Sequence, residues 1–168
     1  MDASFAVHPM FCSHSRGTLL LSPEGGGIAS GSIKQKLNTR SSTMAELVAC
    51  DNFLSKIMWA KNFMEAQGIV LQSHLMQDNQ SSILLAKKGR AALGKQTRAM
   101  NVRYFAIKDH IDSGQLQIFH LKTNKMVADF FTKPLQGRNF LEFRQLILGG
   151  FPDGKGDKIS VVSVHRRQ

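Results

Sequence analysis

The stretch TMAELVACDNFLSKIMWAKNFMEAQG, residues 43–68, predicts the longest element of the fold. Its apolar side chains recur mostly at steps of three and four residues, the spacing of one face of an α-helix. Thr43 is a candidate N-cap, and Gly68 is a candidate end because glycine accepts the left-handed conformation that often follows a helix. We therefore predict an amphipathic helix over residues 43–67. The residues that define its apolar face are Leu47, Cys50, Leu54, Ile57, Met58 and Phe63.

The segments on either side of this helix predict a mixture of strands and helices. Before it, residues 17–22 are typical of a strand and residues 23–27 of a glycine-rich turn. Residues 28–32 and 34–38 are typical of a further strand or strands, so a hairpin or three-stranded meander is expected. After it we predict strands at 69–76 and 115–121, helices at 81–88, 95–113 and 138–148, and a short helix or turn at 125–131. This order indicates an α/β (α+β) fold.

The composition indicates one globular domain and excludes several classes of protein. The chain has 168 residues, of which 42% are hydrophobic and 20% charged, which is enough to bury a core. No apolar run approaches the ~20 residues of a membrane span, so a membrane is not an expected partner. Residues 1–12 lack the basic start of a secretion signal. Two cysteines make neither a disulfide framework nor a zinc site. We therefore expect an intracellular protein, cytoplasmic or nuclear.

The charge favours an anionic partner. There are 22 Lys and Arg residues against 12 Asp and Glu, a net charge of +10. Between residues 87 and 103 there are six basic residues and no acidic one. Few aromatic residues accompany them, which fits phosphate contacts with a nucleic-acid duplex better than stacking on a single strand. The alternative is a solvated face that only aids solubility. The six residues are Lys87, Lys88, Arg90, Lys95, Arg98 and Arg103.

Four acidic residues stand out in this basic chain: Asp2, Glu46, Asp78 and Asp129. Each has a structural interpretation. Glu46 fits a capping box with Thr43, Asp78 or Asn79 fits a helix N-cap, Asp129 fits a helix end, and Asp2 fits solvent exposure. If the four converge, they are hard oxygen ligands suited to Mg²⁺, and two such ions about 4 Å apart can drive phosphodiester hydrolysis. Composition does not decide between the two interpretations.

Several motifs, in one order, resemble a known family. KLNTRSSTMAELVA (residues 36–49) is similar to a segment that usually contains S-S-T-E-A-E in copia-type LTR-retrotransposon polyproteins. EAQG (65–68), QDNQS (77–81), NVRYF (101–105) and ADFFTKPL (128–135) follow in the order and spacing of that family, and DASFAVH (2–8) resembles its first acidic motif. The resemblance covers residues 1–149 and points to the ribonuclease H region of the polyprotein. Residues 150–168 are expected to form a flexible basic tail.

The resemblance implies a fold and an activity. The fold is a mixed five-stranded sheet flanked by helices, with a first strand that is truncated here. The activity is metal-dependent hydrolysis of the RNA strand of RNA–DNA hybrids, with Asp2, Glu46, Asp78 and Asp129 as catalytic residues that bind two Mg²⁺ ions, or Mn²⁺. The stretch from Lys87 to Arg103 would hold the hybrid backbone. The reverse transcriptase region to which this part is normally fused is absent from the chain.

The chain also departs from the family pattern. Met44 stands where relatives usually have the first glutamate of S-S-T-E-A-E, and Ala99 stands where they usually have a histidine. These departures leave an alternative open: a catalytically inactive retroelement remnant that at most binds nucleic-acid duplexes. A domesticated protein-interaction module is a third interpretation. Trp59 and Phe63, four residues apart, are interpreted as core residues rather than as a stacking platform.

Overall fold

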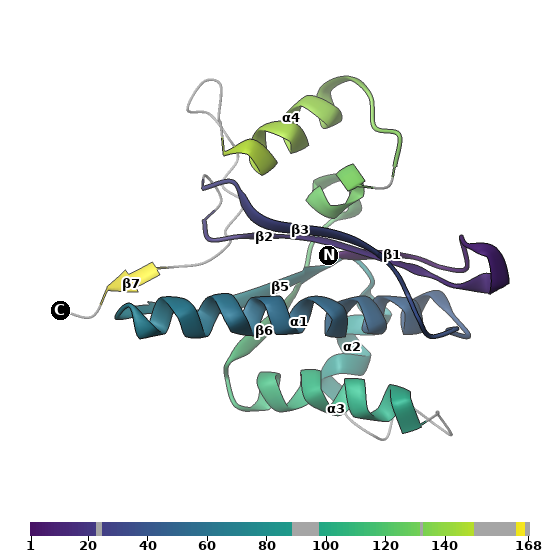
Figure 1. Ribbon diagram of the computed structural model, residues 1–168, viewed down its shortest axis with the longest axis horizontal. Helices are drawn as coiled ribbons and strands as arrows, with labels where there is room; N and C mark the ends of the chain where they lie inside the picture. The colour runs from purple at the N-terminus through teal and green to yellow at the C-terminus, as the bar shows by residue number, and fades with distance from the viewer. Residues whose placement is uncertain (23–24, 89–97, 132, 150–163, 167–168) are drawn as a thin grey trace.

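The computed structural model describes residues 1–22, 25–88, 98–131, 133–149 and 164–166 (Figure 1). The side chains of residues 98–101 and 164–166 are outside this description. Within it the chain is mixed α/β, with four α-helices, short 3₁₀ turns and strands in three groups. In Figure 1 the long helix α1 lies between the sheet formed by β1, β2 and β3 on one side and helix α3 on the other. The predicted α/β class is confirmed at this level.

The first sheet contains the predicted hairpin, and its third strand comes from the start of the chain rather than from residues 34–38. Strands β1 (Asp2–Ser4), β2 (His14–Leu20) and β3 (Gly27–Lys34) form an antiparallel sheet in the order β1-β2-β3. The structure begins β2 three residues before the predicted start, and β3 ends at Lys34, so the strand predicted to continue to residue 38 was wrong beyond residue 34. Register places Asp2 of β1 directly opposite Arg16 of β2. This cross-strand pair lies at the candidate site described below.

Helix α1 spans Ser42–Ala66, and its N-cap is Ser41, whose hydroxyl accepts a hydrogen bond from the Met44 N–H at 3.3 Å. The predicted cap at Thr43 was therefore wrong by two residues. The predicted end was correct, because Gly68 adopts a φ of +77° just beyond the helix. The buried face includes Leu47, Leu54 and Ile57, as the periodicity predicted.

The prediction that Trp59 and Phe63 are core residues was wrong. Their exposed fractions are 64% and 53%, and their rings stack on each other with centroids 5.9 Å apart. Trp59 is two residues beyond the buried Ile57, which rotates it about 200° around the helix axis. The pair therefore lies on the face of α1 that points away from the core.

Two further strand pairs follow α1. Strand β5 (Ser73–Gln77) pairs in parallel with β6 (Leu116–His120), with Leu75 opposite Ile118. Helices α2 (Gln80–Lys88) and α3 (Arg98–Asp112) lie in the connection between these strands. The short strand β4 (Ile69–Leu71) pairs antiparallel with β7 (Val164–Arg166). The predicted strand over 69–76 is thus two strands, and β7 lies in the segment for which we expected only a flexible tail.

The expected five-stranded sheet is divided in the structure. The β1-β2-β3 sheet and the β5-β6 pair are separate hydrogen-bonded groups. They meet where the Met1 amino group donates a hydrogen bond to the Met76 carbonyl oxygen, at 3.1 Å. β1 has three residues, and its ladder is made with β2. The expected single five-stranded sheet is therefore not formed as one continuous hydrogen-bonded ladder among the described residues.

The core forms between α1, the strands and α3. Its most deeply buried large side chains include Leu47, Tyr104, Ile107, Leu116 and Met126, each 1% exposed or less. Complete burial of each such aliphatic side chain contributes roughly 1.5–3 kcal/mol. This core fixes the start of α1 against β1 and β5, which positions the candidate site.

The C-terminal part of the described chain adds three more elements. Turns η3 (Thr123–Lys125) and η4 (Val127–Phe131) precede helix α4 (Gly137–Leu148). Near the other end of the chain, the 3₁₀ turn η1 (Pro9–Phe11) joins β1 to β2. These bounds agree with the predicted short helix at 125–131 and helix at 138–148. Among the described residues, no helix is both long enough and apolar enough to cross a bilayer.

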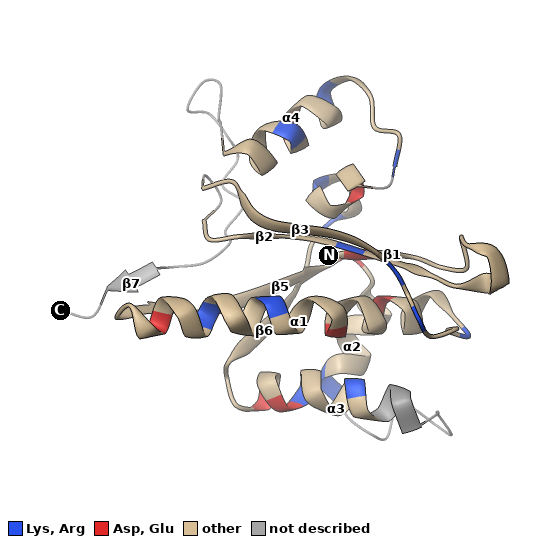
Figure 2. Ribbon diagram, in the orientation of Figure 1, with Lys and Arg blue, Asp and Glu red and all other residues tan. Residues whose placement is uncertain are grey.

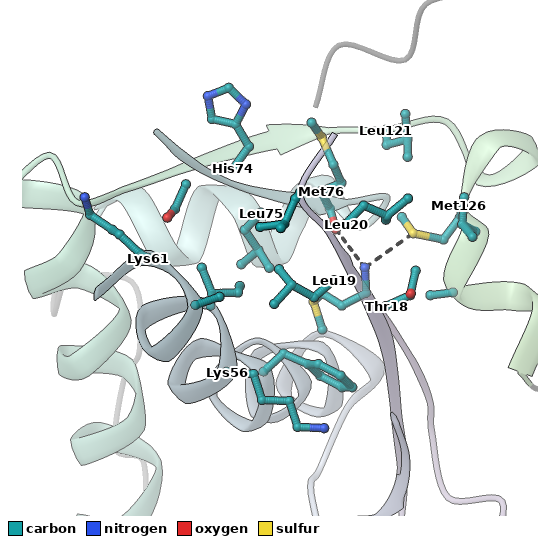
Figure 3. Close-up of a pocket in the computed structure, with 18 of the residues that line it drawn as sticks. Thr18, Leu19, Leu20, Lys56, Lys61, His74, Leu75, Met76, Leu121 and Met126 are labelled. Carbon is teal, nitrogen blue, oxygen red and sulfur yellow. Dashed lines mark hydrogen bonds between the residues drawn. The ribbon is translucent and has the colours of Figure 1, made fainter. Parts of the chain in front are cut away.

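An apolar cavity of about 110 Å³ lies between β2 and β5 (Figure 3). Leu19 and Leu20 line it from β2, Leu75 and Met76 from β5, and Met126 from the turn before η4. None of the four acidic residues singled out above is among its lining residues. The cavity is therefore distinct from the candidate site.

Candidate metal centre

Three of the four predicted acidic residues come together. Asp2 lies in β1, Glu46 in the first turns of α1, and Asp78 directly after β5, and one carboxylate oxygen from each lies within 4.8 Å of the others. Asp2 and Glu46 are buried, with exposed fractions of 6% and 5%, whereas Asp78 is half-buried. These carboxylates supply hard oxygen ligands of the kind that Mg²⁺ prefers, and the half-buried Asp78 is the member that solvent can reach.

Glu46 does not form the predicted capping box. Its Oε1 accepts a hydrogen bond from the backbone N–H of Ala3 at 3.1 Å, which ties the start of α1 to β1. Its Oε2 accepts a second hydrogen bond, from the side-chain amide of Gln77 at 2.9 Å. Ser41 caps the helix, and the Glu46 side chain belongs instead to the group of three carboxylates.

Asp78 is likewise not the cap of α2. The N-cap position belongs to Asn79, whose Oδ1 accepts a hydrogen bond from the Ser82 N–H at 3.1 Å. The Asp78 carboxylate instead accepts a hydrogen bond from the Thr123 hydroxyl at 3.0 Å. Its position at the carboxyl end of a parallel strand is one where ligands commonly bind in α/β sheets.

Gln77 organises the centre and was not identified from the sequence. It is fully buried. Its amide nitrogen donates to Glu46, and its Oε1 accepts hydrogen bonds from the backbone N–H groups of Asp78 at 2.8 Å and Asn79 at 3.3 Å. Alternation along β5 was the available signal, because Ser73, Leu75 and Gln77 all point inward and only a partnered amide is stable there.

Asp129 lies near this group and is not one of its three members. It is buried in η4, and its Oδ2 accepts a hydrogen bond from the Lys133 ammonium at 2.6 Å. Its charge raises the pKa of Asp2, so the two carboxyl groups interact electrostatically. Figure 2 shows acidic residues on β1, on α1 and on η4, the elements that carry Asp2, Glu46 and Asp129.

Burial and neighbouring carboxylates raise the pKa of Glu46 and of Asp2. Burial is the largest cause for Glu46 and the charge of Asp2 is the second, and together they raise the pKa of Glu46 to about 8. Burial and then the charge of Asp129 raise the pKa of Asp2, and the Arg16 guanidinium opposes this shift. Since clustered carboxyl groups disfavour each other's ionisation, a bound divalent cation would stabilise their charged form.

Arg16 is the second residue of the centre that sequence reasoning missed. Its Nη1 donates to Asp2 Oδ2 at 2.7 Å, its Nη2 bonds the Ser4 hydroxyl, and the residue is 4% exposed. Only the register of β1 against β2 reveals this pair, because Arg16 lies in a polar stretch that predicts no functional position.

Comparison with known proteins identifies relatives in plants and yeast. The chain is 29% identical over 124 residues to the Retrovirus-related Pol polyprotein from transposon TNT 1-94 of Nicotiana tabacum and 31% identical over 123 residues to that from transposon RE2 of Arabidopsis thaliana. These matches cover 73% and 71% of the chain. This chain is homologous to a segment of retrotransposon Pol polyproteins. The family resemblance predicted from the motifs is confirmed at this level.

The chain corresponds to a small part of the length of these relatives. It spans 9% and 8% of the two plant polyproteins, and 8% of the yeast Transposon Ty1-JR1 Gag-Pol polyprotein, to which it is 25% identical over 142 residues (83% of the chain). No protein-family model matches the chain. No solved structure matches it. The relatives' names state a polyprotein and no region of it.

The structure describes three of the six predicted nucleic-acid-binding side chains in this retrotransposon segment. Lys87 and Lys88 are exposed in the last turn of α2. Arg103, in α3, forms an ion pair with Asp51 of α1. Arg90 and Lys95 lie outside the described residues, and so does the side chain of Arg98. Figure 2 also shows basic residues on α1, α3 and α4.

Proposed function

We propose that this chain is a ribonuclease H-type endonuclease that hydrolyses the RNA strand of RNA–DNA hybrids with Mg²⁺, or Mn²⁺. The observation that carries the proposal is the convergence of Asp2, Glu46 and Asp78, which come from three separate parts of the chain and place carboxylate oxygens within 4.8 Å of one another. The family motifs that contain these residues support the same assignment.

The arrangement of strands supports a ribonuclease H-like fold. An antiparallel group in the order β3-β2-β1 lies beside a parallel pair, β5-β6, and α1 packs along β1 and β2. Asp2 and Asp78 thereby stand at the junction between the two groups, where the Met1 amino group contacts Met76. A mixed sheet with the carboxylates at its centre is what the resemblance implies.

The chain's own residues have distinct roles in this proposal. Asp2, Glu46 and Asp78 would hold the ion. Gln77 and the Ala3 N–H orient the Glu46 carboxylate through their hydrogen bonds. A bound divalent ion supplies two things: a water of lowered pKa and neutralisation of the phosphate charge. Hydrolysis adds water across the phosphodiester bond, leaving a 5′-phosphate and a 3′-hydroxyl.

Asp129 and the basic residues would complete the site. Asp129 adds negative charge beside Asp2 without joining the three ligands. Lys87 and Lys88, exposed at the end of α2, are suited to contact phosphates of the hybrid. A hybrid would be distinguished from duplex DNA by its 2′-hydroxyl groups.

Cleavage of a labelled RNA–DNA hybrid by the purified chain tests the proposal. The assay contains Mg²⁺, Mn²⁺ or EDTA, and duplex DNA and duplex RNA of the same sequence are the matched substrates. We expect cutting of the RNA strand of the hybrid alone, in either metal and not in EDTA. A chain that is folded by circular dichroism and cuts no hybrid would contradict the enzymatic proposal. Salt-sensitive duplex binding would then favour the inactive remnant.

The raised pKa of Glu46 predicts how stability depends on pH. An unfolded glutamate has a pKa of 4.5, and the folded value is about 8, so between these values the folded chain retains a proton that the unfolded chain has lost. The stability of the metal-free chain should therefore fall as pH rises from about 4.5 to about 8 and then level off. Glu46→Gln should remove this fall, so between pH 4.5 and pH 9 the stability of the metal-free variant should rise relative to that of the wild type by up to about 5 kcal/mol, the value that the pKa shift corresponds to.

Thermal unfolding of both chains at pH 6 to 9, in EDTA and in Mg²⁺, measures this effect. The difference between the two chains isolates Glu46 from the other groups that titrate. Mg²⁺ should raise the Tm of the wild-type chain more at pH 9 than at pH 6, and should have little effect on Glu46→Gln. Parallel pH profiles in EDTA would show that the pKa of Glu46 is not raised.

The two exposed lysines of α2 predict a change in salt dependence. If each contacts one phosphate, Lys87→Gln/Lys88→Gln should reduce the slope of log K against log salt by about 2, and affinity for the hybrid should fall at least about tenfold at low salt. Fluorescence anisotropy with a labelled hybrid over a series of KCl concentrations measures both quantities. Lys61→Gln/Lys108→Gln is the matched control, because these lysines pair with Glu65 and Asp112. An equal slope change in both double variants would argue against a local contact.

A further inference from the structure

We propose that Arg16 acts as a built-in second cation, so that the centre binds one divalent ion rather than two. The inference rests on the proposed function, since it concerns the ion that the carboxylates would hold. It departs from the two-ion expectation that the family resemblance implies. It is based on a difference in neighbouring positive charge between two groups of carboxylates that share Asp2. One group is Asp2 and Asp129, and the other is Asp2, Glu46 and Asp78.

Asp2 and Asp129 each have a protein cation beside them. Arg16 Nη1 lies 2.7 Å from Asp2 Oδ2, and Lys133 Nζ lies 2.6 Å from Asp129 Oδ2. The family resemblance implies that Asp2 bridges two ions and that Asp129 completes the second site, and here each of these two carboxylates has its own cationic partner. Two carboxylates matched by two cations offer little attraction to a further divalent ion.

The other group of carboxylates is different. The hydrogen-bond donors to Glu46 and Asp78 are neutral: the Ala3 N–H, the Gln77 amide and the Thr123 hydroxyl. The Met1 ammonium interacts electrostatically with Asp2, Glu46 and Asp78, and its own hydrogen bonds go to the Met76 carbonyl oxygen and the Met126 sulfur. The donors to Glu46 and Asp78 orient the carboxylates and bring no positive charge of their own. A single divalent ion between Asp2, Glu46 and Asp78 would balance that charge.

Arg16 is held where it is. It lies within β2, opposite Asp2 in the ladder, and is 4% exposed. Its guanidinium bonds two partners of the same neighbouring strand, Asp2 and Ser4. A second ion would have to displace a buried, paired side chain.

The substitution of a guanidinium for an ion has a chemical consequence. The guanidinium supplies positive charge and hydrogen-bond donors, and it does not bind and acidify a water as a metal ion does. Activation of the attacking water would therefore depend on the single ion held by Asp2, Glu46 and Asp78.

The number of Mn²⁺ ions bound per chain tests this inference. Isothermal titration calorimetry gives the stoichiometry, and electron paramagnetic resonance of Mn²⁺ distinguishes an isolated ion from a coupled pair. The chains are the wild type, Arg16→Met, which keeps an unbranched stem without charge, and Arg138→Met, which removes an exposed arginine paired with Glu142 on α4. We expect one ion in the wild type and in Arg138→Met, and a second ion in Arg16→Met bound at least tenfold more tightly than any second event in the wild type.

Other outcomes are decisive as well. Two ions in the wild type would overturn the inference and leave the proposed function intact. One ion in both the wild type and a folded Arg16→Met would also overturn it. No ion in any chain would overturn the proposed metal centre and this inference together. If Arg16→Met does not fold, Arg16→Lys, which keeps the charge, should still bind one ion, and two ions there would contradict the proposal.

Discussion

Asp78→Asn is expected to slow metal-dependent cleavage of the RNA strand by at least about 10³-fold, equivalent to about 4 kcal/mol of transition-state stabilisation. The substitution removes one of three carboxylates that lie within 4.8 Å of one another and places an amide N–H₂ where an oxygen ligand is needed. The chain should remain folded, because Gln77 bonds the backbone N–H of residue 78 and not its side chain. Single-turnover cleavage of a labelled hybrid measures the rate.

Asp109→Asn is the matched control for this prediction. It makes the same change at an exposed position on α3, outside the carboxylate group. We expect its cleavage rate to stay within about twofold of wild type, and both variants to have wild-type circular dichroism spectra. Equal rates for Asp78→Asn and the wild type would exclude Asp78 from the catalytic centre.

Gln77→Leu is expected to destabilise the chain by about 3 kcal/mol. The side chain is fully buried and makes three hydrogen bonds within the centre, to Glu46 and to the N–H groups of Asp78 and Asn79. Leucine has similar volume and satisfies none of these partners, and each buried polar group left unpaired costs about 1–3 kcal/mol. The midpoint of urea unfolding, with the slope unchanged, measures the loss.

Gln72→Leu provides the comparison for Gln77→Leu. Gln72 lies between β4 and β5 and donates one long hydrogen bond, 3.4 Å, to the Gly114 carbonyl. Its loss should change stability by no more than about 0.5 kcal/mol. A difference of less than about 1 kcal/mol between the two variants would mean that Gln77 does not organise the centre.

The elements that depend on local pattern were predictable from the sequence. The periodicity of residues 43–67 gave α1 to within a residue at each end, because a long amphipathic helix has a strong local signal. The cap was misplaced because Ser41, Ser42 and Thr43 are all good caps, and packing against β1 decides among them. Trp59 shows the reverse error: its hydrophobicity indicated burial, and its angular position on the helix placed it in solvent.

The candidate site was predictable only in part. The family motifs pointed to Asp2, Glu46 and Asp78, and the structure brings these three together. Arg16 and Gln77 could not be found in the same way. Their roles depend on which residue lies opposite Asp2 in the β1–β2 ladder and on which face of β5 points inward. The register of one strand against another, and the choice of which face of a strand is buried, depend on tertiary structure. A single sequence specifies both only weakly.

The parallel pairing of β5 with β6 has a consequence for synthesis of the chain. Ser73 of β5 pairs with Leu116 of β6, so the strand that carries Asp78 at its end lacks its ladder partner until residues 116–120 have left the ribosome. The β2–β3 hairpin and α1 join residues close in sequence and can form earlier. During translation the chain therefore passes through a stage in which Glu46 and Asp2 have been made and the third carboxylate is still on an unsupported strand. The centre is a late product of folding, completed only after most of the domain has been synthesised.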